Sequence, residues 1–124
     1  CFKSPWTRCM FEDELYNSNA YYYVIEVDGE IAGYAGFWKI IDEAHITNIA
    51  VHCDHRRRGY GRMLVNTLLE KAKELGIIAV TLEVRVSNSA AISLYESLGF
   101  VSSGVRRGYY SDNNEDALIM WLKL

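Results

Sequence analysis

The stretch Ile49–Arg62, which reads IAVHCDHRRRGYGR, joins two kinds of pattern and decides how the rest of the chain is interpreted. Its first residues, Ile49–Val51, are apolar and typical of the end of a strand. Its last residues open the segment Gly59–Leu75, whose apolar residues recur with the period of an amphipathic helix. A strand that runs through a short turn into such a helix is typical of an α/β unit.

The turn inside this stretch predicts a site for an anion. Four of the eight arginines of the chain lie between positions 56 and 62. The backbone N–H groups at a helix start bind phosphate, and Gly59 and Gly61 let a ligand approach the main chain closely. The spacing lacks the Gly-Lys-Ser/Thr of a Walker loop, and Met63 and Leu64 stand where dinucleotide-binding folds have a third glycine. A solvated charge run with glycines as turn residues is the alternative.

Strand patterns flank this helix on both sides. Asp28-Gly29 lies between two aromatic and β-branched runs, which is a strong signal for a tight hairpin. Within Ala79–Val86, valine and leucine alternate with polar residues, as in a strand with one buried face. The expected elements are, in chain order, a helix over Thr7–Asn17, strands over Tyr21–Val27, Ile31–Ile40 and Glu43–His52, a helix over Gly59–Leu75, a strand over Ala79–Val86, a helix over Ser89–Leu98, and strands over Phe100–Tyr109 and Asp116–Leu124.

These elements predict an α/β (α+β) fold with a mixed, mostly antiparallel central sheet and helices on both faces. We expect a single domain over residues 1–124, because the length suits one domain and no linker or repeat interrupts the pattern. The long helix should end at Gly76. Its buried stripe is expected to comprise Met63, Leu64, Leu68, Leu69, Ala72 and Leu75.

Composition excludes several classes of protein. Half of the 124 residues are apolar, yet no apolar run approaches the ~20 residues that span a membrane. Sixteen acidic and 13 basic residues give a net charge of −3, which disfavours general nucleic-acid binding. Cys1, Cys9 and Cys53 are odd in number and irregularly spaced, so we expect free thiols and no metal site. Because the chain begins at Cys1, we expect that residues precede it and that the domain lacks its first strand.

The motifs resemble those of a known superfamily. The run RRRGYG at Arg56–Gly61 is similar to the Arg/Gln-x-x-Gly-x-Gly/Ala signature of the GNAT superfamily of N-acetyltransferases. Leu82–Arg85, Asn88 and Leu94–Phe100 narrow the likeness to the RimI-type alanine N-acetyltransferases, which act on the N-terminus of a ribosomal protein. The resemblance covers roughly residues 32–124. It implies the GNAT fold and a cytoplasmic enzyme, monomeric or weakly dimeric and without direct contact to nucleic acid. The reaction it implies is direct transfer of the acetyl group of acetyl-CoA to a protein α-amine in a ternary complex.

The resemblance also implies which residues bind acetyl-CoA. The amides of positions 57–62 would hold the pyrophosphate, and the strand end would pair with the pantetheine arm and stabilise the oxyanion. Asn88 would bind the pantetheine amides, although an N-cap for the helix that follows is an equally good interpretation. The cofactor residues implied are Ile49, Ala50, Val51, Arg56, Arg57, Arg58, Gly59, Tyr60, Gly61, Arg62 and Asn88.

Catalytic and substrate-binding roles follow from the same resemblance. Glu83 would be the general base, because an α-amine with a pKa of ~7.7–8 is largely protonated at neutral pH and must lose a proton before it attacks. Tyr95 would protonate the departing CoA thiolate. From the pattern alone, Glu83 is an outward residue of an alternating strand and Tyr95 a core aromatic. We expect both side chains to point into one cleft. Pro5, Trp6, Tyr109 and Tyr110 are expected to embrace the substrate peptide.

Three other functions remain open from the sequence. The first is an acetyltransferase for a small-molecule amine or a lysine side chain. The second is a non-catalytic acyl-CoA-binding sensor, and the third is an RNA-associated module that uses Arg56–Arg58 and Arg106-Arg107. Cys53 is a candidate only for a covalent route, since no histidine–acid arrangement around it is evident.

Overall fold

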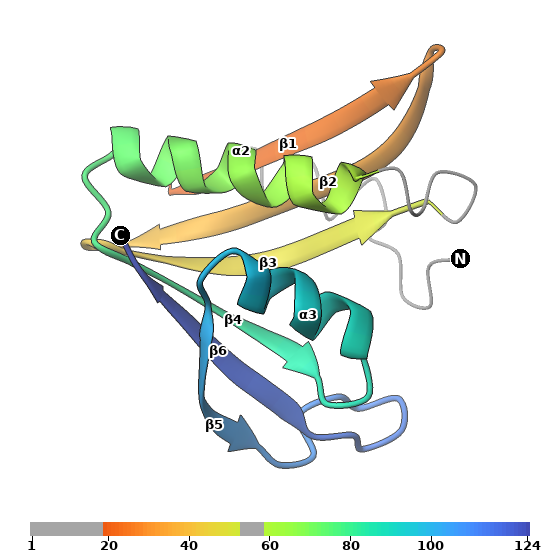
Figure 1. The fold of residues 1–124 in the computed structure, drawn as a ribbon, viewed down its shortest axis with the longest axis vertical. Coiled ribbons are helices and arrows are strands. Elements are labelled where there is room, and N and C mark those ends of the chain that lie inside the picture. Colours follow the sequence, from red (N-terminus) through yellow and green to blue (C-terminus); the bar gives the residue numbers. More distant parts are fainter. Residues whose placement is uncertain (1–18, 53–58) are drawn as a thin grey trace.

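The computed structural model describes residues 19–52 and 59–124. Every element that the sequence predicts within these ranges is present, with small differences at the ends. The helix expected over 7–17, Pro5, Trp6, Arg56–Arg58 and the three cysteines lie outside the described residues. The elements in Figure 1 are β1 (Ala20–Val27), β2 (Glu30–Ile40), β3 (Glu43–Val51), α2 (Tyr60–Glu74), β4 (Ala79–Arg85), α3 (Ser89–Ser97), β5 (Val101–Arg106) and β6 (Ala117–Lys123).

The hairpin predicted at Asp28-Gly29 is confirmed. Val27 pairs with Glu30 across the turn, so the loop between β1 and β2 has two residues. Asp28 and Gly29 have φ angles of 51° and 81°. Both are positive, as a type I′ turn requires.

The six strands form one sheet in the order β1-β2-β3-β4-β6-β5. β3 and β4 are parallel, and the other neighbouring pairs are antiparallel. The predicted mixed, mostly antiparallel sheet is thus confirmed. Helix α2 connects the two parallel strands, as parallel pairing requires a crossover.

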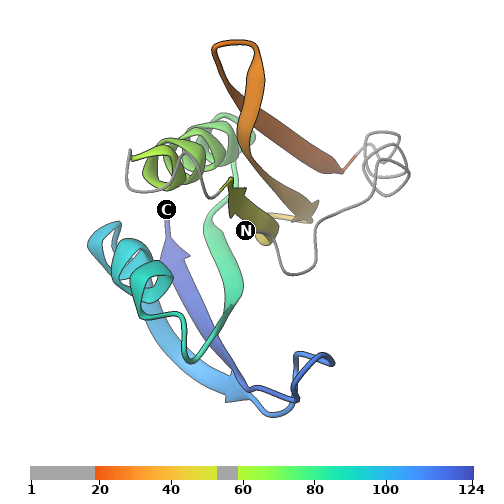
Figure 2. The same ribbon diagram turned by 90° about the vertical axis from the view of Figure 1, so that its right-hand side faces the viewer.

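Both described helices lie on the same side of the sheet, as the two ribbon views show (Figures 1 and 2). The β3–α2–β4 and β4–α3–β5 connections step along the sheet in the same direction, and crossovers of one hand then place their helices on one face. The sequence predicts helices on both faces, and the two helices within residues 19–52 and 59–124 lie on one. The helix expected over Thr7–Asn17 lies outside the described part of the chain.

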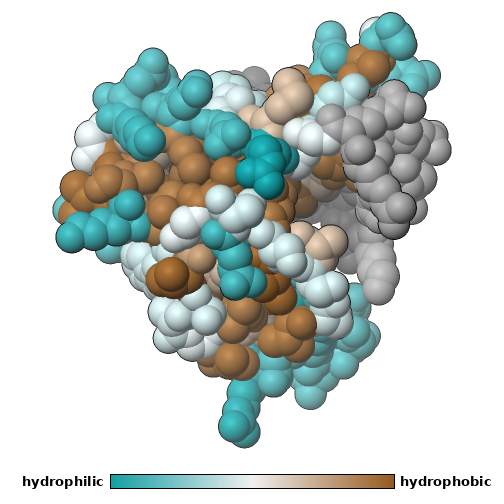
Figure 3. All heavy atoms as spheres, in the orientation of Figure 1, coloured by the Kyte–Doolittle hydropathy of each residue, from teal (hydrophilic) through white to brown (hydrophobic). Residues whose placement is uncertain are grey.

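The core lies between the two helices and the sheet. Helix α2 packs against β1, β2 and β3, and its buried residues join one core cluster with the valines and leucines of β4. Phe100 packs against Tyr95 of α3 in the same cluster. In Figure 3 apolar side chains reach the surface in a band between α2 and α3. The buried residues of α2 are Leu64, Val65, Leu68, Leu69 and Ala72.

The buried stripe predicted for α2 was wrong in including Met63 and omitting Val65. Met63 is 55% exposed, whereas Val65, absent from the predicted stripe, is fully buried. Met63 and Ala72 are nine residues apart, which is two and a half helical turns at 3.6 residues per turn, so they project to opposite sides.

Candidate active site

The site is built where the parallel strands β3 and β4 diverge. Their pairing covers only Glu43–Ile46 with Ala79–Leu82 within the described residues, and we call this part the closed end. Beyond it lies the open end, formed by Thr47–Val51 and Glu83–Arg85 (Figure 1). At the open end β3 stays paired with β2, and β4 stays paired with β6.

A β-bulge lies at the start of the open end. Phe37 of β2 pairs with Ile46, but Gly36 pairs with Asn48, so Thr47 is the extra residue of β3. Bulges of this kind bend a strand and are frequent beside active sites. The bend explains why β3 leaves β4 here.

Tyr22 of β1 secures the bulge. Its ring lies over Gly36, where an added Cβ would stand 2.1 Å from a ring carbon. Its hydroxyl lies 3.1 Å from Oγ1 of Thr47. Gly36 therefore has to be glycine, because any side chain would displace the ring that holds Thr47.

The predicted cofactor strand, Ile49–Val51, forms the rest of the open end of β3. Its main chain pairs with Gly33–Ala35 of β2. The Ile49 and Val51 side chains pack against the hydrophobic core. These side chains therefore serve the core, and the binding role of the main chain stays a prediction.

Helix α2 begins after Gly59, a residue that has no side chain with which to cap it. Its N-cap, Gly59, has a φ of 77° and no side-chain hydrogen bond at the helix start. Gly61 permits close packing on α3, since an added Cβ would touch Leu94 at 3.4 Å. The Arg62 guanidinium donates to Oγ of Ser97 at 2.9 Å, so this side chain bridges α2 and α3. Tyr60 is the first residue of the helix.

Asn88 caps the second helix. Its Oδ1 accepts a hydrogen bond from the amide of Ala91 at 3.1 Å. This confirms the N-cap interpretation, and the pantetheine contact stays a prediction. The two N-cap residues thus differ: Asn88 caps α3 with its side chain, whereas Gly59 at α2 has no side chain to cap with.

Glu83 is the central polar group of the open end. Its side chain is only 8% exposed. Oε2 lies 2.5 Å from Nε2 of His45 on β3, and Oε1 lies 3.4 Å from Nε of Arg106 on β5. The carboxylate of β4 is therefore held by side chains of two other strands, β3 and β5.

His45 was missed by the sequence prediction. It pairs with Thr81 in the parallel ladder, so it lies on the same face as Glu83 and two residues before it in register. The signal was available only once β3 and β4 were known to be neighbours, because the two residues are 38 positions apart.

Tyr109 and Tyr110 lie near Glu83, between β5 and β6. Their rings are 5.0 Å apart and tilted by 59°. Burial raises the pKa of Tyr109, and the negative charge of Glu83 adds to this effect. Burial also raises the pKa of Tyr110 to about 12, against the opposing charge of Arg85. Both hydroxyls are therefore protonated at neutral pH and can donate hydrogen bonds.

Tyr95 of α3 is 7% exposed and packs against Phe100, with ring centroids 5.7 Å apart. Burial raises the pKa of its hydroxyl well above the usual value, and Tyr110 adds to the shift. Tyr95 lies among core residues on the helix side of the sheet. Glu83 alternates with Leu82 and Val84, which face the core. Tyr110 acts electrostatically on Tyr95, and Glu83 acts on Tyr110. The shared cleft for Glu83 and Tyr95 stays a prediction.

Residues 19–52 and 59–124 contain neither a metal cluster nor a membrane-spanning helix. No group of three His, Cys, Asp or Glu side chains there could hold a metal ion. No helix in the same ranges is long and apolar enough to cross a membrane.

Known proteins share both the sequence and the fold. Residues 1–100 match the model of the acetyltransferase (GNAT) family. A Bacillus subtilis protein provisionally named a ribosomal protein bS18-alanine N-acetyltransferase is 47% identical over 124 residues, covering 99% of this chain and 82% of the relative.

Two solved structures extend the comparison. The ribosomal-protein-S18-alanine N-acetyltransferase of Escherichia coli has a TM-score of 0.87 and 39% identity, covering 98% of this chain and 79% of that one. A streptothricin acetyltransferase candidate from Bacillus anthracis, solved with acetyl coenzyme A, has a TM-score of 0.81 and 26% identity. The match covers 92% of this chain and 68% of that one. The resemblance found in the sequence is confirmed, and the chain belongs to the acetyltransferase (GNAT) family.

Proposed function

We propose that this protein transfers the acetyl group of acetyl-CoA to the N-terminal α-amine of a protein, and that its substrate is a ribosomal protein that begins with alanine. The observation that carries the proposal is the buried Glu83 carboxylate at the open end, beside His45 and a pair of protonated tyrosines. The names of the Bacillus subtilis and Escherichia coli relatives support the choice of substrate.

The open end fits acetyl-CoA. Beyond Ile46, β3 is no longer paired with β4, so an extended pantetheine arm can lie along Ile49–Val51 as an added strand would. Gly59, the N-cap of α2, offers no side-chain cap of its own, and backbone N–H groups at a helix start bind phosphate. We assign the pyrophosphate to this helix start, with Arg56–Arg58 and Tyr60–Arg62. When bound, acetyl-CoA supplies the acetyl group as an activated thioester.

Glu83 acts as the general base in this proposal. Its Oε atoms accept the proton that the α-amine must lose in order to attack, directly or through one water. Nε2 of His45 holds the carboxylate in place at 2.5 Å. The His45 side chain is 31% exposed, so it also offers the proton a route toward solvent.

Tyr95 acts as the general acid. Its raised pKa keeps a proton on Oη, which can be given to the sulfur that leaves. In this proposal the amine approaches Glu83 and the thioester sulfur approaches Tyr95, so that the two meet where β3 and β4 diverge. Asn88 would hydrogen-bond the pantetheine amides in addition to capping α3.

Tyr109 and Tyr110 form the acceptor side of the proposed site. Their protonated hydroxyls can donate to the main-chain carbonyls of the first residues of a peptide. Pro5 and Trp6 are assigned to the same wall by the resemblance alone. The protein would act in the cytoplasm, because its proposed substrate belongs to the ribosome. We also propose that it acts as one domain, monomeric or weakly dimeric.

The experiment is intact mass measurement after incubation with acetyl-CoA. Its substrates are short peptides that begin with Ala, Ser or Met, each with an internal lysine, and free polyamines. We expect one acetyl group on the Ala peptide and none on the same peptide with a blocked N-terminus. Acetylation of the blocked peptide or of the polyamines alone would assign the protein to lysine or small-amine transfer and overturn the proposal.

A further inference from the structure

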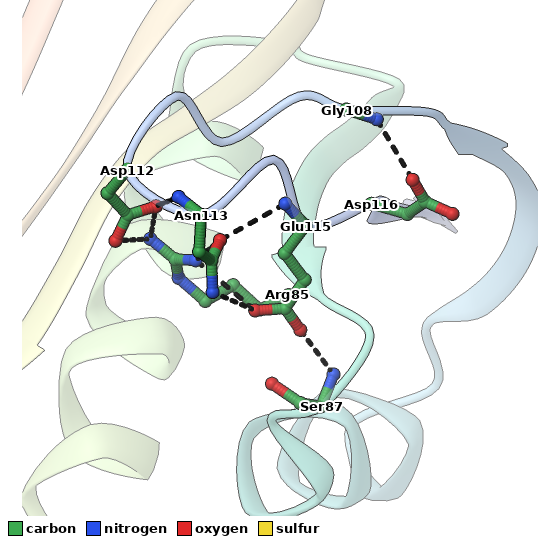
Figure 4. A network of polar contacts seen from close by, with 7 residues as sticks. All are labelled: Arg85, Ser87, Gly108, Asp112, Asn113, Glu115 and Asp116. Atoms are coloured by element: carbon green, nitrogen blue, oxygen red, sulfur yellow. Dashed lines mark hydrogen bonds and ion pairs between the residues drawn. The ribbon is translucent and has the colours of Figure 1, made fainter.

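Arg85 of β4 binds several side chains of the segment between β5 and β6, residues 107–116 (Figure 4). Nη2 of Arg85 donates to both carboxylate oxygens of Asp112, each at 2.9 Å. Nη1 donates to Oδ1 of Asn113 at 3.1 Å and to Oε1 of Glu115 at 3.2 Å. Arg85 is only 22% exposed, so one guanidinium fork holds three residues of this segment.

Glu115 extends the attachment to the turn before α3. Its second oxygen, Oε2, accepts a hydrogen bond from the amide of Ser87 at 2.9 Å. Inside the segment, Oδ1 of Asn113 accepts from the amide of Glu115 at 3.1 Å. The contacts form a connected network, and networks around a bidentate arginine contribute more than isolated surface pairs.

The same arginine supports one of the two tyrosines. The guanidinium carbon of Arg85 lies 4.0 Å from the ring centroid of Tyr110, which is close contact for a cation–π interaction. Tyr110 contacts Tyr109 in turn. Arg85 and Glu83 alternate on the same face of β4, two residues apart. A single strand therefore carries both the carboxylate and the side chain that holds the tyrosines near it.

We propose that Arg85 is a positioning residue for the acceptor side of the reaction. By fixing residues 107–116, it keeps Tyr109 and Tyr110 over Glu83, where the incoming peptide would bind. This inference rests on the proposed function, because it assigns the tyrosines to the acceptor. Loss of the guanidinium releases the segment, weakens acceptor binding and leaves acetyl-CoA binding unchanged, since the start of α2 and the open end of β3 do not depend on it.

A merely structural role would give a different result. If Arg85 only added stability, its loss would lower the melting temperature and the amount of folded enzyme. The KM values of the folded fraction would then stay the same for both substrates. The ratio of the two KM values therefore separates positioning from stability, and local amide exchange gives a second, independent readout.

The test compares three variants of the full chain with the wild type. Arg85→Met removes the fork, and Asp112→Asn weakens it from an exposed residue that cannot disturb the core. Arg107→Met is the matched control, since it removes an exposed arginine of the same segment that is outside the network. Steady-state kinetics on the Ala peptide are combined with hydrogen–deuterium exchange measured by mass spectrometry over residues 107–116.

For Arg85→Met we expect the peptide KM to rise roughly tenfold or more, as for a displaced positioning group, while the KM for acetyl-CoA changes by less than about twofold. Exchange over residues 107–116 should speed up, and exchange in β2 should not. Asp112→Asn should give smaller changes in the same direction, and Arg107→Met none. An unchanged peptide KM and unchanged exchange in Arg85→Met overturn the inference. If that variant fails to fold, the same result in Asp112→Asn overturns it.

Failure of the proposed function would look different. In that case the wild type would not acetylate the peptides, whereas the exchange experiment needs no acceptor. If the wild type acetylates another amine, the KM for that amine replaces the peptide KM. Faster exchange in Arg85→Met with a raised KM for that amine supports the inference, and unchanged values overturn it.

Discussion

The two ends of the β3–β4 pair show how one pair of strands can serve both the core and the site. At the closed end, Glu43–Ile46 and Ala79–Leu82 form a parallel ladder. At the open end the ladder stops after the bulge at Thr47, and the strands separate. Yet the face of β4 toward the helices stays buried along both ends, because Leu82 and Val84 are each at most 5% exposed.

The difference teaches that the site arises from lost strand pairing and not from lost packing. On the face away from the helices, the open end carries Glu83 and Arg85, and each is held by side chains of other strands or loops. In the proposed function, acetyl-CoA lies between these strands while the core beneath them stays intact. Neighbouring residues of β4 should therefore respond to substitution in separate ways.

Glu83→Gln should have the largest effect on the reaction. Removal of the general base should lower kcat roughly 10²-fold or more, without changing acetyl-CoA affinity. The loss should be greatest below pH ~7.7, where the α-amine substrate is mostly protonated, and smaller at alkaline pH. Steady-state kinetics across pH and calorimetric titration with acetyl-CoA measure the two quantities.

Glu43→Gln is the matched control, because it makes the same chemical change at the closed end of the same strand pair. It should leave kcat unchanged. Turnover by Glu83→Gln that equals the wild type across the pH range would refute the assignment of the base.

Leu82→Ala, one residue before Glu83, should lower stability and leave the kinetics nearly unchanged. Leu82 is 2% exposed in the core, and truncation of a buried leucine lowers the free energy of unfolding by about 2–5 kcal/mol. Chemical denaturation measures this loss. The folded fraction should keep KM values close to those of the wild type. A large change in acetyl-CoA KM at unchanged stability would show that the face toward the helices also takes part in binding.

The contrast between these two residues was partly predictable from sequence. Alternation in Ala79–Arg85 separated Leu82 from Glu83, and the motif around Glu83 indicated acetyl transfer. Asn88 before a helical segment predicted its capping bond, which the structure contains. Local periodicity and local motifs carry this kind of information, since they depend on nearby residues alone.

What the sequence did not predict depends on which strands become neighbours. His45 faces Glu83 only because β3 and β4 pair in one register, and Thr47 is a bulge only relative to β2. The Arg85 network joins a strand to a segment more than 20 positions away. Such contacts form only when the sheet is assembled, so local sequence patterns do not predict them.

Thr47→Val tests the bulge that starts the open end, with a smaller expected effect. The variant keeps the shape of the side chain but loses the hydrogen bond to the Tyr22 hydroxyl at 3.1 Å. One such bond contributes about 1 kcal/mol to stability. We also expect a rise of a few-fold in acetyl-CoA KM, because β3 is less firmly bent. Thr81→Val at the closed end is the control, and an equal rise in KM there would contradict a special role for the bulge.

The smallest predicted effect is an acid-induced loosening of residues 107–116, which Arg85 attaches to the open end. Hydrogen bonds from the hydroxyl and amide of Ser87, assisted by Arg85, lower the pKa of Glu115 from its ordinary 4.5 to about 2. Since the pKa of Glu115 is lower in the folded protein than in the unfolded chain, the ionised carboxylate stabilises the state in which residues 107–116 are attached. Its contribution is complete above pH 4.5 and is lost as the pH falls toward 2. The hydrogen bond to Arg85 also lowers the pKa of Asp112, so this carboxylate acts in the same direction.

The amide proton of Ser87 reports this change directly, because it donates to Oε2 of Glu115. In NMR spectra its chemical shift should titrate with a midpoint near pH 2, well below that of an ordinary glutamate. Glu115→Gln should abolish the transition, since no proton is then taken up. Amides of the closed end, such as that of Val80, should not follow this curve. If the closed-end amides shift with the same midpoint, the whole sheet responds to acid, and the separation between the two ends does not hold.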